Sequence, residues 1–351
     1  MIKSQLEAGT VGQRPAINAV VRGVTRVVSG MTPQERSFCA YMLMGPSGTG
    51  KSHLIGMLAR VIHGDERRVV VADCTQFVHG DPWMVFAAQL APLFDGSVID
   101  HGASLREAPP LSIVRIEYLE RGPEEISRGL GVALETGQLV LPEGRRGSLR
   151  NCLVFLTSTL CSKEILDEAP RIGFSGAQDD DDEEMHDRIY ETCRQQAEQR
   201  FGGNLIGRLD ALVVFHRFQH EHLSEILDHR LDRLNAWLAP RRIRCSFLPA
   251  AKVLLLERGG RDLRLGARAL IRTHQRLVEF PLADMMLSGR IVAGTHVRID
   301  RRNADDYLHF DVTEDRSAAT SIGAREVPVS WASRRASATP RAGDSRPSSA
   351  H

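Results

Sequence analysis

Eight consecutive residues, Gly45-Pro-Ser-Gly-Thr-Gly-Lys51-Ser52, have the types and spacing needed to hold a phosphate chain. They match G-x-x-x-x-G-K-[ST], after an apolar run and at the start of a helical pattern. Glycines let backbone N–H groups close around phosphate oxygens, and the helix N-terminus adds positive potential. We expect Lys51 to contact the β- and γ-phosphates of a nucleoside triphosphate and Ser52 to bind Mg²⁺. The other expected phosphate-binding residues are Gly45, Pro46, Ser47, Gly48, Thr49 and Gly50.

Such a loop needs a strand before it and a helix after it, and the sequence supplies both. Short apolar runs alternate with amphipathic helical patterns over the first two thirds of the chain, which is typical of a parallel sheet covered by helices. Residues 1–216 are therefore interpreted as an α/β domain. We predict strands near 39–44, 68–73, 111–117, 151–157 and 211–216, and helices near 51–63, 83–93, 123–136 and 186–200.

Beyond residue 216 the pattern changes to helices followed by two short strands, which predicts a small, mainly helical domain over 217–312. Residues 313–351 are rich in Ser, Arg, Ala and Pro and too poor in apolar residues to bury a core, so we predict a disordered tail. The acidic run 178–184 is predicted to be a solvated loop, because its like charges repel one another. The second-domain helices are expected at 221–238, 249–259 and 266–287, and its strands near 291–299 and 306–311.

The composition excludes several classes of protein. The 45 Lys and Arg nearly balance the 44 Asp and Glu, so no global positive field argues for a nucleic-acid partner. No apolar run reaches membrane-spanning length and the N-terminus has no signal-peptide or transit pattern, so we expect a cytoplasmic protein without a membrane partner. The six cysteines are scattered without a C-x-x-C pair, which indicates ordinary reduced thiols.

Several motifs besides the phosphate loop occur in the order expected of one family. They are Val11-Gly-Gln-Arg-Pro-Ala-Ile17, Phe201-Gly-Gly-Asn-Leu-Ile-Gly-Arg-Leu-Asp210, Gly266-Ala-Arg-Ala-Leu270 and Phe280-Pro-Leu-Ala283. With them the chain resembles the AAA+ ATPases, and specifically the second ATPase module of Clp-type disaggregases and unfoldases, from about residue 10 to 312. The resemblance implies a P-loop three-layer sandwich with a parallel sheet, followed by a small helical lid domain, that binds ATP and Mg²⁺.

The resemblance also implies roles for residues outside the phosphate loop. Val11 and Gln13 would lie near the adenine. Arg208 would reach the γ-phosphate bound by a neighbouring subunit and neutralise charge that develops during phosphoryl transfer. Such a residue requires a homo-oligomeric ring, which we expect to be a hexamer. Arg268 would reach the same nucleotide from the small domain, so that the nucleotide state moves one domain against the other.

The sequence departs from the family at the metal-binding strand, Ser112-Ile-Val-Arg-Ile-Glu-Tyr-Leu-Glu-Arg121. The family has an Asp that holds magnesium and then a Glu that polarises the attacking water. A gap-free alignment puts Glu117 and Tyr118 at these positions, whereas one inserted residue makes Glu117 the catalytic Glu and leaves Ile116 at the metal position. Either alignment loses one carboxylate, and a phenol with a pKa of about 10 is a poor base. Glu120, one turn further on, is a candidate replacement.

Two more positions differ from the family. Thr159 stands where the first sensor is usually Asn, although its hydroxyl can still hold a water or a phosphate oxygen. The pore loop that grips polypeptide corresponds to Ala91-Pro-Leu-Phe-Asp-Gly96, in which the only aromatic is Phe94.

Two hypotheses follow. In the first, the chain forms an ATP-binding ring that remodels a protein complex, for a client that the sequence does not name. Hydrolysis is then slow or partner-stimulated, with Glu117, Thr159, Arg208 and Arg268 as catalytic residues. The rival is a hydrolysis-deficient nucleotide-binding scaffold or regulatory subunit beside an active partner ATPase.

Overall fold

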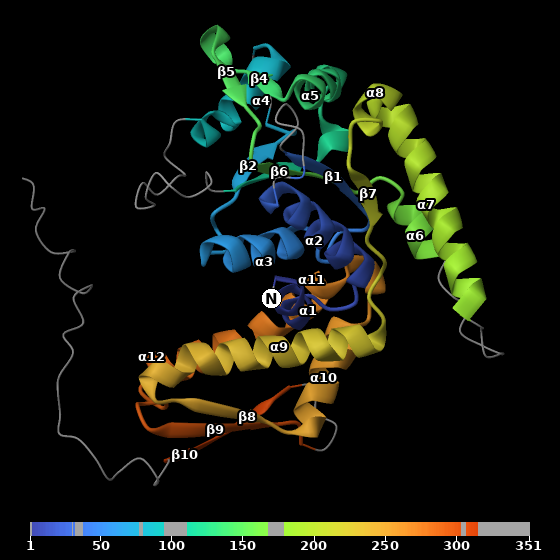
Figure 1. Cartoon of the computed structure of the whole chain (residues 1–351). Coiled ribbons are helices and arrows are strands. Elements are labelled where there is room, and N and C mark those ends of the chain that lie inside the picture. Colours follow the sequence, from blue (N-terminus) through green and yellow to red (C-terminus); the bar gives the residue numbers. More distant parts are fainter. Residues whose placement is uncertain are drawn as a thin grey trace, which may run out of the picture.

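The computed structural model describes residues 2–29, 31, 38–76, 80–94, 111–167, 179–302 and 307–314 (Figure 1). A five-stranded parallel sheet forms its centre, in the order β2-β3-β6-β1-β7. The predicted parallel sheet is thus confirmed. The strands are β1 (Cys39–Met44), β2 (Val70–Asp73), β3 (Ser112–Glu117), β6 (Cys152–Ser158) and β7 (Ala211–Val214).

The sheet is covered by helices on both faces, because its central strands are apolar on both sides. All residues of β1 and β6 are buried. Along β1, Cys39, Tyr41 and Leu43 pack with α2 and α3, whereas Met42 and Met44 pack with the helices on the opposite face. This alternation follows from the two-residue period of a strand and produces a three-layer sandwich.

Figure 1 shows α2 and α3 between the sheet and the second domain, with α4 and α5 on the far side of the sheet. The helices of the first domain are α1 (Ile2–Gly9), α2 (Arg14–Val28), α3 (Lys51–His63), α4 (Pro82–Gln89), α5 (Glu124–Thr136), α6 (Ser162–Asp167), α7 (Asp179–Phe201) and α8 (Gly203–Ile206). A hairpin of β4 (Gln138–Val140) and β5 (Arg146–Ser148) follows α5.

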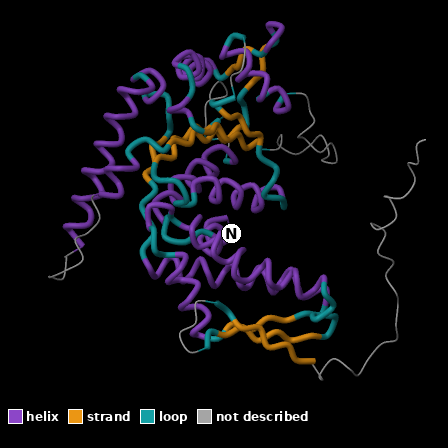
Figure 2. The backbone as a smooth tube through the Cα atoms, turned by 180° about the vertical axis from the view of Figure 1, so that it is seen from behind, coloured by secondary structure: helices purple, strands orange, loops and turns teal. Residues whose placement is uncertain are grey.

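The second domain has its own core, built around side chains such as Leu227, Leu255, Leu270 and Val297. Its helices pack on a three-stranded sheet with the order β10-β9-β8 (Figure 2). The elements are α9 (His220–Leu238), β8 (Arg244–Phe247), α10 (Pro249–Gly259), α11 (Ala267–His274), α12 (Phe280–Leu287), β9 (Thr295–Asp300) and β10 (His309–Glu314). A π-helical turn, Gln275–Glu279, joins α11 to α12.

Three sequence expectations for the second domain and its borders need correction. Strand β8 was not predicted, because four residues carry too short an alternation to be recognised. The two other strands lie a few residues later than expected, at Thr295–Asp300 and His309–Glu314. Residues 313 and 314, which were predicted to belong to the disordered tail, are part of the last strand, and residues 315–351 lie outside the described part of the chain.

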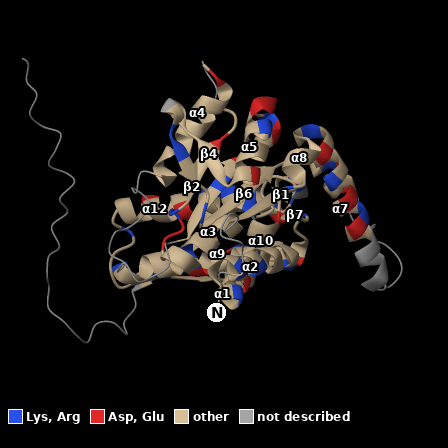
Figure 3. Ribbon diagram, turned by 45° about the horizontal axis from the view of Figure 1, so that its top comes forward, with Lys and Arg blue, Asp and Glu red and all other residues tan. Residues whose placement is uncertain are grey.

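The acidic run was predicted to be a loop, and this was wrong for residues 179–184. They form the first turns of α7, which extends to Phe201. Acidic residues are in general favoured in the first turn of a helix, where the helix dipole is positive. Figure 3 shows that both signs of charge then alternate along the rest of α7.

The cysteine prediction agrees with the structure, since all six are free and buried. Cys39 and Cys152 lie on central strands. Within the described residues, no helix combines the length and the apolar character needed to cross a membrane.

Candidate nucleotide site

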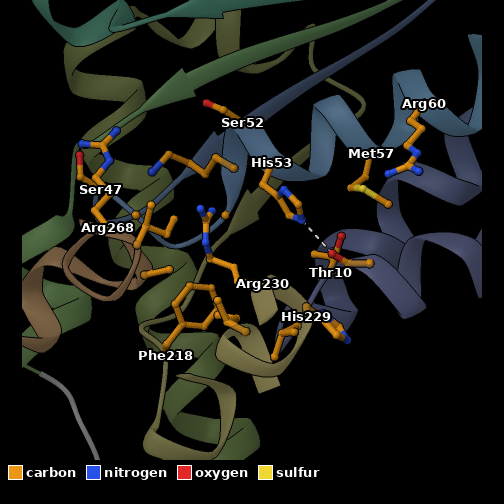
Figure 4. A pocket seen from close by; sticks show the side chains of 18 of the residues that line it. Thr10, Ser47, Ser52, His53, Met57, Arg60, Phe218, His229, Arg230 and Arg268 are labelled. Atoms are coloured by element: carbon orange, nitrogen blue, oxygen red, sulfur yellow. Dashed lines mark hydrogen bonds between the residues drawn. The ribbon is translucent and has the colours of Figure 1, made fainter. Parts of the chain in front are cut away.

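A cavity of about 740 Å³ lies between the two domains and contains the phosphate loop in its wall. In Figure 4, Ser47, Ser52 and His53 of the first domain face Phe218, His229 and Arg230 of the second. The ends of β3 and β6 contribute Glu117, Tyr118 and the segment Thr157, Ser158 and Thr159. Ligand sites in open α/β sheets lie at the carboxyl ends of the strands, and this volume is in the range of small-molecule pockets.

Lys51 is the first residue of α3, and its side chain is buried inside the loop that precedes it. Its Nζ donates hydrogen bonds to the carbonyl oxygens of Gly45 (2.5 Å) and Pro46 (2.8 Å). Burial lowers the pKa of Lys51 to about 8, although the nearby charge of Glu120 raises it, and Arg268 lowers it further. A buried ammonium group whose hydrogen-bond partners in the described part of the chain are neutral carbonyls is suited to receive phosphate oxygens.

The phosphate loop also contacts the second domain directly. Gly48 has φ +83°, and a Cβ at this position would overlap the carbonyl oxygen of Leu265. The backbone N–H of Ala267 donates to the carbonyl oxygen of Gly48 over 3.1 Å. Only glycine permits this approach, which brings the N-terminus of α11 and the side chain of Arg268 to the cavity.

Ser52 and Glu117 face each other across the cavity wall. The Ser52 hydroxyl donates to Glu117 Oε1 at 3.4 Å, and the same carboxylate pairs with Arg115 at 3.0 Å. Ile116 is buried in the core on the other side of the strand. Two hard oxygen donors at this separation fit Mg²⁺, which Ser52 and Glu117 would hold. The metal would supply charge neutralisation for the phosphates.

Tyr118 and Glu120 follow Glu117 in a strained turn. Tyr118 has φ 56°, in the left-handed region that non-glycine residues adopt rarely. Its ring is contacted by the guanidinium group of Arg121 at 5.2 Å. Glu120 lies beside Thr159, whose backbone N–H (3.0 Å) and hydroxyl (2.6 Å) both donate to Glu120 Oε1. Glu120, the candidate replacement carboxylate, is therefore hydrogen-bonded to Thr159, the residue expected at the first-sensor position.

Val11 and Gln13, the two N-terminal residues expected near the adenine, occupy different places. Val11 lines the cavity, beside Thr10. Gln13 is buried behind the phosphate loop, and its Nε2 donates to the carbonyl oxygens of Thr49 (3.3 Å) and His216 (3.0 Å). Gln13 thus ties the loop to the end of β7 and does not line the cavity.

Arg208 lies outside the cavity, after the short helix α8. Its Nη2 pairs with Glu135 of α5 at 2.6 Å, and both side chains are partly exposed to solvent. Among the described residues the structure therefore brings Lys51, Ser52, Glu117, Thr159 and Arg268 together and leaves Arg208 on another surface of the same subunit.

Sequence reasoning missed one wall of the cavity. The face of α9 that lines it carries Ile226, His229, Arg230 and Arg233. Their spacing of i, i+3, i+4 and i+7 puts them on one side of a helix, and that periodicity was the available signal.

Phe94, the aromatic residue of the predicted pore loop, packs against the first domain instead of extending into solvent. Phe94 is half-buried against the core of the first domain, and its ring lies against Gly147 of strand β5. Asp95 and Gly96 lie outside the described residues. In this arrangement the side chain of Phe94 stabilises the β4–β5 hairpin.

The doubly covered parallel sheet and the glycine-rich loop at the start of α3 define a P-loop nucleotide-binding protein. Two family models match the chain: an AAA domain (Cdc48 subfamily) over residues 36–212, and the C-terminal D2-small domain of ClpB protein over residues 218–299. The chain belongs to the AAA+ ATPase family and resembles its Clp-type second module.

Individual relatives agree with this assignment. The ATP-binding subunit ClpC of the ATP-dependent Clp protease from Staphylococcus saprophyticus is 28% identical over 323 residues, covering 91% of this chain and 38% of the relative. ClpC from Staphylococcus aureus is 27% identical over 321 residues, covering 90% and 38%. This chain thus spans well under half the length of these curated relatives.

Solved structures show the same fold at low identity. The Saccharomyces cerevisiae Hsp104–ADP complex has a TM-score of 0.69 and 20% identity, covering 88% of this chain and 51% of that chain. A closed state of Hsp104 with ATPγS and casein has a TM-score of 0.67, also at 20% identity, covering 89% and 51%. The predicted AAA+ sandwich with a small, mainly helical domain is confirmed by these matches.

Proposed function

We propose that the chain binds Mg-ATP between its two domains and works as a ring-forming, chaperone-like ATPase that remodels a protein complex. The observation that carries the proposal is the cavity in which Lys51 and Ser52 of one domain face Arg268 of the other. A nucleotide bound there would touch both domains, so ATP binding and release would change how they pack.

The charges around the cavity support specific roles. Lys51 holds the β- and γ-phosphates, Ser52 and Glu117 hold Mg²⁺, and Arg268 senses the γ-phosphate from the second domain. Arg208 lies outside the cavity of its own chain, as expected of a residue that completes the site of a neighbouring subunit. The absence of a carboxylate at Tyr118 favours slow hydrolysis, or hydrolysis that depends on a partner.

A hydrolysis-deficient scaffold remains the second candidate function. It is favoured by Tyr118 at the position beside Glu117 and by the packing of Phe94 into the first domain. In that case nucleotide binding alone would set the domain arrangement, and an active partner ATPase would supply turnover.

Ring formation gives one testable expectation. With saturating ATP and Mg²⁺ we expect the protein to sediment as a hexamer, because the nucleotide in one subunit is contacted from the next. Analytical ultracentrifugation with and without nucleotide measures this. A monomer at tens of micromolar protein and saturating ATP would contradict the ring.

The burial of Lys51 predicts a pH dependence of binding. Its pKa is lowered from the ordinary value to about 8, so the ammonium form that attracts phosphate is present below pH 8 and is lost above it. We expect ATP affinity to fall by up to about tenfold per unit as the pH rises through 8. Titration calorimetry from pH 6.5 to 9.5 tests this, and Lys51→Ala should show no such fall.

A further inference from the structure

Thr159 and Glu120 form a hydroxyl–carboxylate pair at the wall of the nucleotide cavity. Thr159 lines the cavity at the end of β6, and its hydroxyl donates its only proton to Glu120 Oε1 over 2.6 Å. Its oxygen therefore has only lone pairs to offer a water molecule in the cavity. A water beside Thr159 would be oriented by donating a hydrogen bond to this oxygen.

The carboxylate behind Thr159 is held firmly. Glu120 Oε1 also accepts the backbone N–H of Thr159 at 3.0 Å. Arg200 of α7 donates through Nη2 to the carbonyl oxygens of Glu120 (2.7 Å) and Gly122 (3.1 Å), which fixes the turn that carries the side chain. Glu120 Oε2 is buried and has no hydrogen-bond partner among the described residues.

The other candidate groups near the phosphate loop are less suited to accept a proton from the attacking water. Glu117 contacts Ser52 and pairs with Arg115, in the place where a metal ligand is needed. Tyr118 offers a phenol, which is a weak base at neutral pH. Glu120 is close enough for its charge to act on Lys51. Glu120 lies near the phosphate loop and is joined to the hydroxyl of Thr159 in the cavity wall, and, unlike Glu117, it is not placed as a metal ligand.

We propose that Thr159 and Glu120 act as a proton relay that replaces the missing carboxylate beside Glu117. This inference rests on the proposed ATPase function. Thr159 is the catalytic residue because it touches the attacking water, and Glu120 is a positioning and proton-accepting residue that acts through it.

The step balances as follows. The water oxygen forms a bond to the γ-phosphorus while the bond from that phosphorus to the β–γ bridging oxygen breaks, and its electron pair stays on ADP. One water proton passes to Thr159 Oγ1 as the threonine proton passes to Glu120 Oε1. The products are ADP, inorganic phosphate and a protonated Glu120, which returns its proton to solvent through Thr159.

Three variants test the relay by steady-state phosphate release. Glu120→Gln keeps an oxygen that accepts both hydrogen bonds from Thr159 but is a far weaker proton acceptor, so kcat should fall about 100-fold with little change in KM. Thr159→Val should cause a similar loss, whereas Thr159→Ser should stay within about threefold of wild type. The matched control is Glu124→Gln, an exposed carboxylate on α5, which should behave as wild type.

The double variant Glu120→Gln/Thr159→Val separates a relay from independent roles. In a relay it should be no slower than the slower single variant, because both changes break one proton path. Multiplied losses would overturn the proposal, as would Glu120→Gln retaining more than a third of wild-type kcat. If Glu120→Gln does not fold, the Thr159→Val and Thr159→Ser pair carries the test, and equal rates for that pair would overturn it.

Wild-type protein with Lys51-dependent ATP binding but no phosphate release would overturn both the relay and the hydrolytic part of the proposed function. Turnover that is insensitive to Glu120 overturns the relay alone.

Discussion

Lys51→Ala should abolish phosphate release and weaken ATP binding by about 10- to 150-fold, the equivalent of about 1.5–3 kcal/mol for hydrogen bonds to a charged group. Lys51 Nζ is buried in the loop and donates only to the carbonyl oxygens of Gly45 and Pro46 among the described residues. Phosphate oxygens are stronger acceptors than these carbonyls, so the ammonium group would turn to them when nucleotide binds.

The measurement is titration calorimetry with ATP, combined with a continuous phosphate assay. The matched control is Lys252→Ala, which removes a lysine that pairs with Asp228 on the surface of the second domain at 2.6 Å. This control should bind and hydrolyse ATP as wild type does. Unchanged ATP affinity in Lys51→Ala would contradict the assignment of the loop as the phosphate site.

Arg208→Ala should lower kcat about 1,000-fold while ATP affinity stays within about threefold of wild type. An arginine that enters a neighbouring site stabilises charge in the transition state and does little for binding of the ground state. In its own subunit Arg208 pairs with Glu135 on a partly exposed surface, where an ion pair contributes little to stability. The loss should therefore be catalytic, with a nearly unchanged unfolding temperature.

Mixing variants tests whether Arg208 acts between subunits. Lys51→Ala subunits have a defective site but an intact Arg208, whereas Arg208→Ala subunits have an intact site. Mixed rings should recover part of the activity that neither variant has alone. Arg194→Ala, which removes an arginine from exposed ion pairs on α7, is the matched control and should have no effect. Full activity of Arg208→Ala alone would contradict a role between subunits, and so would a failure of the mixed rings to recover activity.

The sequence predicted the large elements because they are long and strongly periodic. β1 and β6 are short, mostly apolar runs, and α3 follows a glycine-rich loop whose pattern is typical of phosphate binding. The phosphate loop could be identified because its geometry depends on neighbouring residues alone. Strand β8 and the start of α7 could not be predicted from the sequence. Strand β8 has only four residues and depends on packing in the small domain, and the acidic run at the start of α7 carries no apolar periodicity.

By itself, then, the sequence determined the α/β class, the phosphate loop and the presence of one carboxylate, Glu117, between Ile116 and Tyr118, since these depend on residue type and local spacing. Only the tertiary structure decided which distant residues meet. It joined Thr159 to Glu120, brought Arg268 to the cavity beside Gly48, and added the face of α9 that carries His229 and Arg230. Such contacts arise when strands pair in register and a second domain packs on the first, and no local pattern in the chain specifies those distances.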